Sequence, residues 1–197
     1  ADAFKTGEFM SQFFPCPREL TETTSGSFGD PDEQKALLLK QAANELKYGV
    51  PTWYEWCINN WGTKWDVGSE HFEPTYTEGD TSITVSFDSA WGPPLEFYSK
   101  MTDELGYSVK AYYYESGMAF CGIWNDGEDE TFKIPATSDE VADKIPAAID
   151  EVFNISDWHI AYTTNSTHGP RRNFEVLKNH IFNTRNAINR WIDEVDI

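Results

Sequence analysis

Three carboxylates in the first half of the chain lie beside tryptophans: Glu55, Asp66 and Asp88. Many glycosidases use two carboxylates near aromatic side chains, one as the acid and the other as the base or nucleophile. The three residues therefore allow a carbohydrate-active or other hydrolase with a tryptophan-lined cleft. Unrelated acidic proteins would offer the same residues by chance, and Glu55 has a competing role as a helix-capping residue.

The tryptophans themselves are concentrated in residues 50–66, VPTWYEWCINNWGTKWD, which hold four of the eight. Thr52 and Glu55 have the spacing of a capping box and Gly62 is a typical helix stop, so a short helix is predicted between them. Its apolar side chains point in every direction, as in a buried helix. We therefore favour a structural core over a sugar site, and Lys64 is expected to stack on tryptophan rings. The predicted core tryptophans are Trp53, Trp56, Trp61, Trp65 and Trp91.

Charge is the outstanding feature of the composition, with 33 acidic and 15 basic residues and a net charge of −18. Direct binding to nucleic acid or to an anionic membrane needs a basic surface, so neither is expected. Residues 1–168 hold 29 acidic and ten basic groups, a net −19. The acids either keep the protein in solution by repulsion or meet a basic partner. The candidate binding residues are Glu128, Asp129, Glu130, Asp139, Glu140 and Asp143.

Metal and cofactor chemistry has little support in the sequence. The four histidines are scattered, and the three cysteines make no Cys-x-x-Cys pair. We therefore predict no metal site and no cofactor, and two of the cysteines should be buried, reduced thiols. Because no signal peptide or long apolar span is present, the expected location is a cytoplasm.

The periodic segments predict an α+β fold. Strand, helix, two strands, helix, strand is the split βαβ order of a ferredoxin-like fold, here an antiparallel sheet with helices packed on one face. Pro146 should break or kink the second of these helices. The segments are a helix over 32–47, a strand over 82–87, a helix from Pro94 to Gly106, strands over 107–114, 118–124 and 130–134, a helix from Thr137, and a strand over 157–162.

The C-terminal segment, residues 169–197, differs from the acidic domain 1–168. Its net charge is +1, and its apolar residues between Asn173 and Val195 alternate in steps of three and four, broken only by Thr184. That spacing predicts a long helix that packs on the acidic domain or, across a homodimer, on a second copy.

Several motifs resemble one family. Trp53-Tyr54-Glu55-Trp56, the run NWGTKW at 60–65 and the run FDSAWGPP at 87–94, preceded by FFPCPREL at 13–20, are similar to the YubB-like proteins of bacteriophages and plasmids. The resemblance covers roughly residues 7–125 and implies a ferredoxin-like fold, a mobile-element origin and a bacterial host, but no activity. The family pattern would place a strand before Phe4, so we expect a trimmed or divergent member.

Two functional hypotheses follow. The first is a non-enzymatic phage or mobile-element protein whose acidic surface binds a basic surface of a host protein, as a nucleic-acid mimic or an inhibitor of host defence. The second is the hydrolase with a tryptophan-lined cleft.

Overall fold

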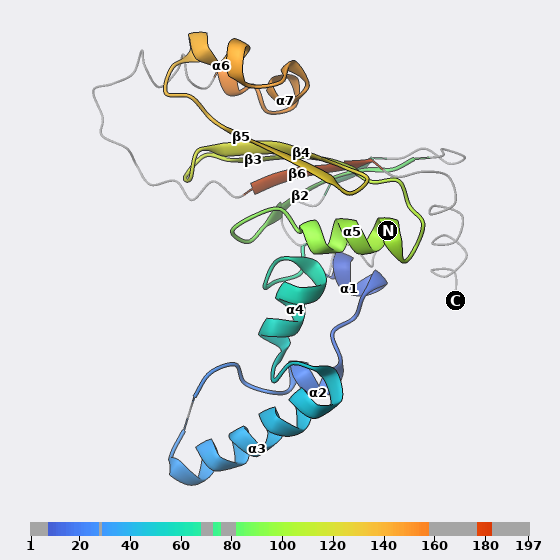
Figure 1. The fold of residues 1–197 in the computed structure, drawn as a ribbon, viewed down its shortest axis with the longest axis vertical. Helices are drawn as coiled ribbons and strands as arrows, with labels where there is room; N and C mark the ends of the chain where they lie inside the picture. Colours follow the sequence, from blue (N-terminus) through green and yellow to red (C-terminus); the bar gives the residue numbers. More distant parts are fainter. Residues whose placement is uncertain (1–7, 28, 68–72, 76–81, 158–176, 183–197) are drawn as a thin grey trace.

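One antiparallel sheet of six strands organises the protein, in the order β1-β2-β6-β3-β4-β5. Figure 1 shows the computed structural model, which describes residues 8–27, 29–67, 73–75, 82–157 and 177–182. The strands are β1 (Glu73–Thr75), β2 (Thr84–Ser89), β3 (Lys110–Glu115), β4 (Phe120–Asn125), β5 (Glu128–Lys133) and β6 (Leu177–Phe182).

The described helices include four before the sheet, one between β2 and β3, and two after β5. Helix α5 follows β2 and leads into β3, and β6 pairs antiparallel with both of these strands. β2 and β3 are therefore parallel, with one strand between them, which is a split βαβ unit. The helices are α1 (Phe9–Phe13), α2 (Arg18–Thr21), α3 (Pro31–Tyr48), α4 (Trp53–Trp61), α5 (Leu95–Asp103), α6 (Ser138–Lys144) and α7 (Ala147–Phe153).

The predicted C-terminal helix is wrong over residues 177–182, which form strand β6. Without β6, the facing edges of β2 and β3 would have no backbone partners inside the sheet, and unpaired buried backbone groups are costly. Register places Ile181 between Val85 and Ala111, two buried positions. Backbone hydrogen bonding to β2 on one side and β3 on the other thus makes this segment a strand, although its apolar residues have helical spacing. The rest of the predicted helix lies outside the described residues.

Helices cover both faces of the sheet, so the expectation of helices on one face is also wrong. Figure 1 shows α5 and α1 on one side and α6 and α7 on the other. β3 explains this arrangement, because Ala111 packs into one core cluster and its neighbour Tyr112 into the other. Successive side chains of a strand point to opposite faces of the sheet, so a strand of consecutive apolar residues must be covered by other elements on both faces. We call the α5 side the first face and the α6 side the second face.

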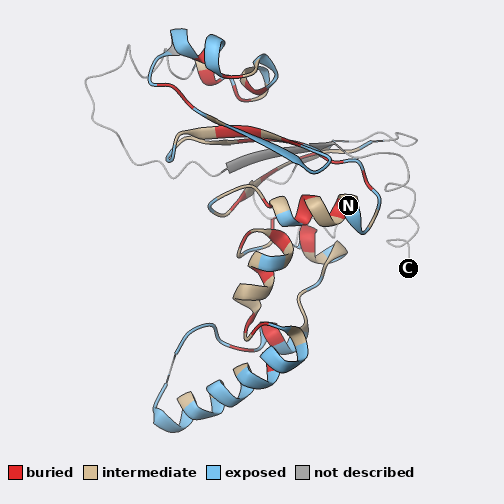
Figure 2. Cartoon of the chain, viewed as in Figure 1, coloured by how far each residue is buried: buried red, intermediate tan, exposed pale blue. Residues whose placement is uncertain are grey.

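The first-face core is the larger of the two clusters and joins the helices α1, α4 and α5 to the sheet. Phe97 of α5 makes edge-on ring contacts with Phe9, Phe13 and Phe14. On the second face, Val141, Ile145 and Ile149 pack with Cys121 of β4. Figure 2 shows buried residues concentrated along the sheet and along the sides of the helices that face it.

Helix α3 projects away from the sheet, together with α2 (Figure 1). Asp30 caps it with a capping box and Gly49 ends it in the left-handed conformation, close to the predicted bounds. Its contacts are mainly polar: the buried Asn44 donates to Thr23 Oγ1 at 2.9 Å and to the Pro51 carbonyl at 3.1 Å. The apolar stripe that predicted this helix, including Leu38, Leu39 and Leu46, is exposed instead of packed.

The remaining predictions agree with the structure where it describes them. The strands and the helix predicted between residues 82 and 134 correspond to β2, α5, β3, β4 and β5. Pro146 separates α6 from α7, as expected for a residue without a backbone N–H. Of the strand predicted over 157–162, only Asp157 is described, and it is helical.

Candidate functional site

The predicted tryptophan helix is confirmed as α4. Thr52 Oγ1 accepts from the Tyr54 N–H at 3.3 Å and is also hydrogen-bonded to the Glu55 carboxylate. Gly62 ends the helix at φ 80°. Glu55 is thus engaged in the cap, although the contacts differ from the predicted capping box. Thr52 accepts from Tyr54 instead of Glu55, and the Glu55 carboxylate bonds the Thr52 hydroxyl.

The core assignment of the tryptophans holds only in part. Trp61 is buried, and Trp53 and Trp56 are half-buried against the same cluster. Trp65 and Trp91 were predicted as core but are 57% and 68% exposed. Both lie on loops, after α4 and after β2, where the chain direction and not the residue type decides burial.

Asp66 ties α1 to the rest of the fold. Its carboxylate accepts from the backbone N–H groups of Met10 at 2.6 Å, Ser11 at 2.8 Å and Val67 at 2.7 Å. Burial raises the pKa of Asp66 and outweighs these three donors, which lower it. The side chain therefore acts as a cap for a helix start that has no other side-chain cap.

The three carboxylates of the hydrolase hypothesis do not converge. Asp66 and Glu55 lie at the starts of α1 and α4, on the first-face side of the sheet. Asp88 follows the buried first-face residue Phe87 on β2, so it belongs to the second face. A glycosidase pair must flank a single bond, and a carboxylate on the other side of a sheet cannot take part.

We expect Asp66→Asn to lower the free energy of unfolding by about 1–3 kcal/mol. Both carboxylate oxygens of Asp66 accept hydrogen bonds from backbone N–H groups. In asparagine one of these oxygens is replaced by an NH₂ group, which cannot accept them. Chemical denaturation followed by circular dichroism measures the change. Asp103→Asn, an exposed position on α5, is the control and should leave stability unchanged. Equal stability of Asp66→Asn and the wild type would remove the structural role and return Asp66 to the catalytic candidates.

The first group of predicted binding residues lies on the edge strand β5. Glu128, Asp129 and Glu130, which we call the β5 group, are all exposed. Asp129 points to the first face, where its Oδ1 accepts from the Tyr113 hydroxyl at 2.7 Å. Glu130 lies opposite Ile123, which packs into the second-face core, so it borders that face.

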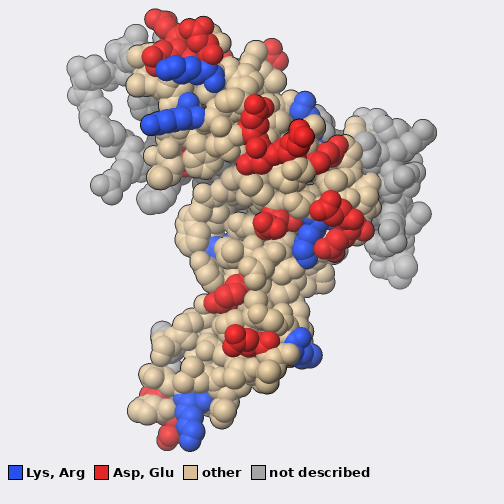
Figure 3. All heavy atoms as spheres, in the orientation of Figure 1, with Lys and Arg blue, Asp and Glu red and all other residues tan. Residues whose placement is uncertain are grey.

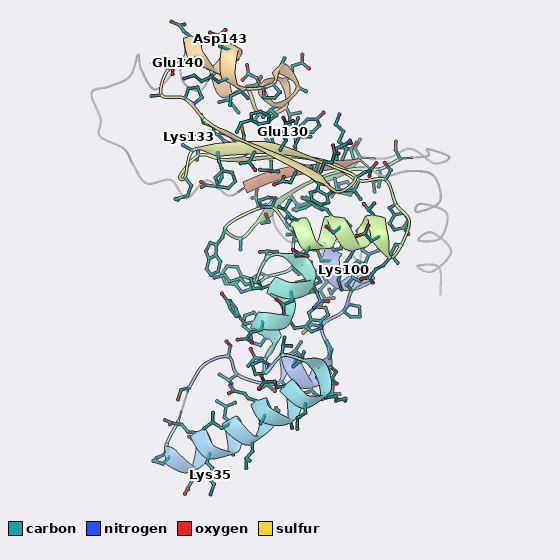
Figure 4. All side chains as sticks on the ribbon, in the orientation of Figure 1. Lys35, Lys100, Glu130, Lys133, Glu140 and Asp143 are labelled. Atoms are coloured by element: carbon teal, nitrogen blue, oxygen red, sulfur yellow. The ribbon has the colours of Figure 1, made fainter. Side chains whose placement is uncertain are left out.

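The second group lies on α6, the helix that covers the second face. Asp139, Glu140 and Asp143, the α6 group, are likewise exposed. Glu140 is 3.3 Å from Lys144 in an i,i+4 ion pair. Figure 3 shows acidic side chains over α6 and over the neighbouring part of the sheet on one visible side, with a few basic side chains between them. Figure 4 places Glu130 on the sheet and Glu140 and Asp143 on the helix above it.

Sequence reasoning missed the side chain that anchors the β5 group. Tyr113 is buried on β3, and its hydroxyl is 2.7 Å from Asp129 Oδ1 and 2.8 Å from Thr131 Oγ1. Burial is the main reason that the pKa of Tyr113 is raised, and the Asp129 carboxylate adds to it. The sequence did contain one signal. Gly122 lies in the middle of an apolar strand, and a glycine at such a position often marks the close approach of another group, here the Tyr113 ring.

A family model described as the ferredoxin-like domain in Api92-like protein matches residues 60–158, just over half of the chain. The chain belongs to this family. No curated protein and no solved structure gives a significant match.

The matched Api92-like domain runs from the end of α4 through α7. It contains both acidic groups, Asp66, Asp88 and the exposed Trp65 and Trp91. Glu55 and the helices α1, α2 and α3 precede it. The ferredoxin-like prediction is therefore confirmed, and each candidate residue except Glu55 and the core residues Trp53 and Trp56 belongs to that domain.

Within the described ranges, no group of three or more His, Cys, Asp or Glu side chains could hold a metal ion. His71, His159 and His168 lie outside those ranges. None of the described helices is long and apolar enough to cross a bilayer.

The three cysteines are free thiols in this Api92-like protein, and Cys57 and Cys121 are buried as expected for two of them. A hydrogen bond with Cys57 lowers the pKa of Cys16. The same contact, together with burial, raises the pKa of Cys57. Burial raises the pKa of Cys121 to about 12. Cys16, at the half-buried Pro15-Cys16-Pro17 turn, is thus the thiol most easily ionised.

Proposed function

We propose that this protein acts by binding, without catalysis, and that its acidic surface meets a basic surface of a host protein. The observation that carries the proposal is the exposure of all six carboxylates of the β5 and α6 groups. They lie on β5 and α6, which follow one another in a chain whose net charge is −18. Figure 3 shows acidic side chains over α6 and over the neighbouring part of the sheet. Exposed carboxylates that lie close together repel each other, and a basic partner would relieve that repulsion.

The setting that we propose is the cytoplasm of a bacterium that carries a phage or plasmid, as the resemblance to YubB-like proteins implies. A nucleic-acid-binding protein of the host is the kind of partner that fits best, because its basic groove is complementary to a surface of carboxylates. The acidic side would then occupy the site of the phosphates and compete with them. The hydrolase hypothesis has weaker support, because Glu55, Asp66 and Asp88 are spread over both sides of the sheet.

The test begins with affinity capture from the host cell, which identifies a partner, and continues with charge reversal. Substituting lysine for all three residues of the β5 group, or of the α6 group, should weaken binding about tenfold or more, because like charges then face each other across the interface. Binding should also weaken as salt rises. Circular dichroism should show intact folding. The α6 reversal loses the exposed Glu140–Lys144 ion pair, which contributes little. The β5 reversal loses the hydrogen bond from Tyr113 to Asp129, but the Tyr113 hydroxyl keeps Thr131 as a partner.

A matched control changes the charge by the same amount elsewhere. Glu96 and Asp103 on α5 and Glu104 at its C-cap are exposed, and this helix covers the first face. Their reversal to lysine should weaken binding much less than either acidic-group variant. Two outcomes would show that the acids only keep the protein in solution. One is an affinity that does not change with salt, and the other is an equal affinity of the control and the two test variants. Competition by duplex DNA for the captured partner would support the mimic.

A further inference from the structure

Two exposed tryptophans contact the same cation. Lys64 Nζ lies 3.7 Å from the ring centroid of Trp65 and 3.7 Å from that of Trp91. The two centroids are therefore no more than twice that distance apart, close enough for one small cation to contact both rings. The sequence predicted a lysine stacked on tryptophan but not its second ring, which comes from a loop 26 positions further along the chain.

The loops that carry the rings are fixed to one another. Thr63, which is buried, donates from Oγ1 to the Ala90 carbonyl at 3.0 Å and so joins the turn after α4 to the loop after β2. Within the second loop, Ser89 Oγ donates to the Gly92 carbonyl at 2.7 Å. The two loops are thus fixed relative to one another before any ligand binds.

Gly62 brings the first turn close to the start of α5. A Cβ at Gly62 would lie 3.0 Å from the Leu95 nitrogen and 3.1 Å from the Glu96 nitrogen, and φ is +80°. Trp91 itself has φ 70°, a left-handed conformation that bulky residues rarely adopt. A strained backbone that presents an exposed aromatic ring, held by neighbouring hydrogen bonds, is a pattern associated with binding sites.

We propose that Trp65 and Trp91 form a cation slot that receives an arginine side chain of the basic partner, while Lys64 fills the slot in the free protein. The proposal rests on the proposed function for the nature of the partner. Ring faces attract cations, and the flat guanidinium stacks between two rings better than an ammonium does. The net charge of −18 favours a cationic ligand over a neutral or anionic one.

The test uses the full chain and three probes: a hexa-arginine peptide, a hexa-lysine peptide and maltohexaose. Isothermal titration at low salt gives affinities, and the indole N–H resonances of Trp65 and Trp91 report contact. Hexa-arginine should bind more tightly than hexa-lysine and shift both indole signals. Trp65→Ala and Trp91→Ala should each weaken hexa-arginine binding about fivefold to tenfold and reduce the preference over lysine. Met118→Ala, an exposed apolar position outside the slot, should change neither.

Lys64→Ala tests whether the Lys64 side chain competes with an arginine ligand for the slot, as distinct from the effect of removing one positive charge. Lys35→Ala removes the same charge from the far end of α3, as Figure 4 shows. Lys64→Ala should tighten hexa-arginine binding more than Lys35→Ala does. Equal effects of the two variants would overturn the assignment of Lys64 as the occupant of the slot.

Failure of the slot and failure of the acidic surface give different results. If both tryptophan variants bind hexa-arginine like the wild type while the β5 and α6 reversals lose it, the slot is wrong and the acidic surface stands. If the tryptophan variants lose affinity and the reversals do not, the slot stands and the acidic surface is wrong. Indole shifts with maltohexaose but not with hexa-arginine would overturn the cation slot in favour of a sugar platform.

Discussion

Trp61→Ala should lower the free energy of unfolding by about 3–5 kcal/mol, the usual cost of removing a large buried aromatic side chain. Trp61 is 5% exposed, and its Nε1 donates to the Phe14 carbonyl at 3.0 Å. Its ring also meets that of Trp56 edge-on, with centroids 5.5 Å apart. The substitution thus opens a cavity where α4 meets the segment that follows α1. Since small domains have a stability of about 5–15 kcal/mol, much of the total would be lost.

Guanidinium denaturation followed by circular dichroism measures the change, and Trp65→Ala is the matched control. The control removes the same side chain from an exposed position, so its effect should stay within about 1 kcal/mol. Trp61→Phe sets an upper limit on the contribution of the hydrogen bond, because it loses that bond to Phe14 and only a smaller part of the apolar volume. Equal stability of Trp61→Ala and Trp65→Ala would contradict the burial that distinguishes these two residues.

Those two tryptophans also show what the sequence could predict. The capping box at Thr52 and Glu55 and the stop at Gly62 are local signals, and they placed α4 correctly. Whether Trp65 is buried depends on where the chain goes after Gly62, and no local pattern records that direction. The same holds for the acidic groups, whose charges can be counted in the sequence although the faces of the sheet on which they lie cannot be predicted from it.

The sheet shows a further limit. Strand β6 pairs with β2 and β3, whose residues are about 60 to 100 positions away in the chain. The spacing of apolar residues within a segment predicts a helix or a strand, but pairing with distant strands can override that prediction. The second covered face, in contrast, had a signal in the sequence. The runs AYYY in β3 and FCGIW in β4 are continuously apolar, which is typical of strands covered on both sides, and only alternating strands expose one face.

Gly122 interrupts one of these apolar runs, and Gly122→Ala should lower the free energy of unfolding by about 1–3 kcal/mol through overpacking. A Cβ at this position would lie 2.2 Å from both Cζ and the hydroxyl oxygen of Tyr113 and 2.6 Å from the Glu130 carbonyl oxygen. The Tyr113 ring cannot turn away freely, because its hydroxyl is bonded to Asp129 and Thr131. The sign of this change in stability is informative. In a strand interior without such a close contact, alanine is more stabilising than glycine by about 0.5–1 kcal/mol.

Gly92→Ala is the control, because a Cβ there would meet nothing within 4 Å, and it should leave stability nearly unchanged. In a Tyr113→Ala background, Gly122→Ala should cost much less than in the wild type, and the double-mutant cycle measures that coupling. Additive effects in the cycle would show that the ring does not lie over the glycine. The coupling also bears on the acidic surface, because Tyr113 holds Asp129 from beneath. A variant that displaces the ring should release the Asp129 side chain and weaken partner binding even though every carboxylate is still present.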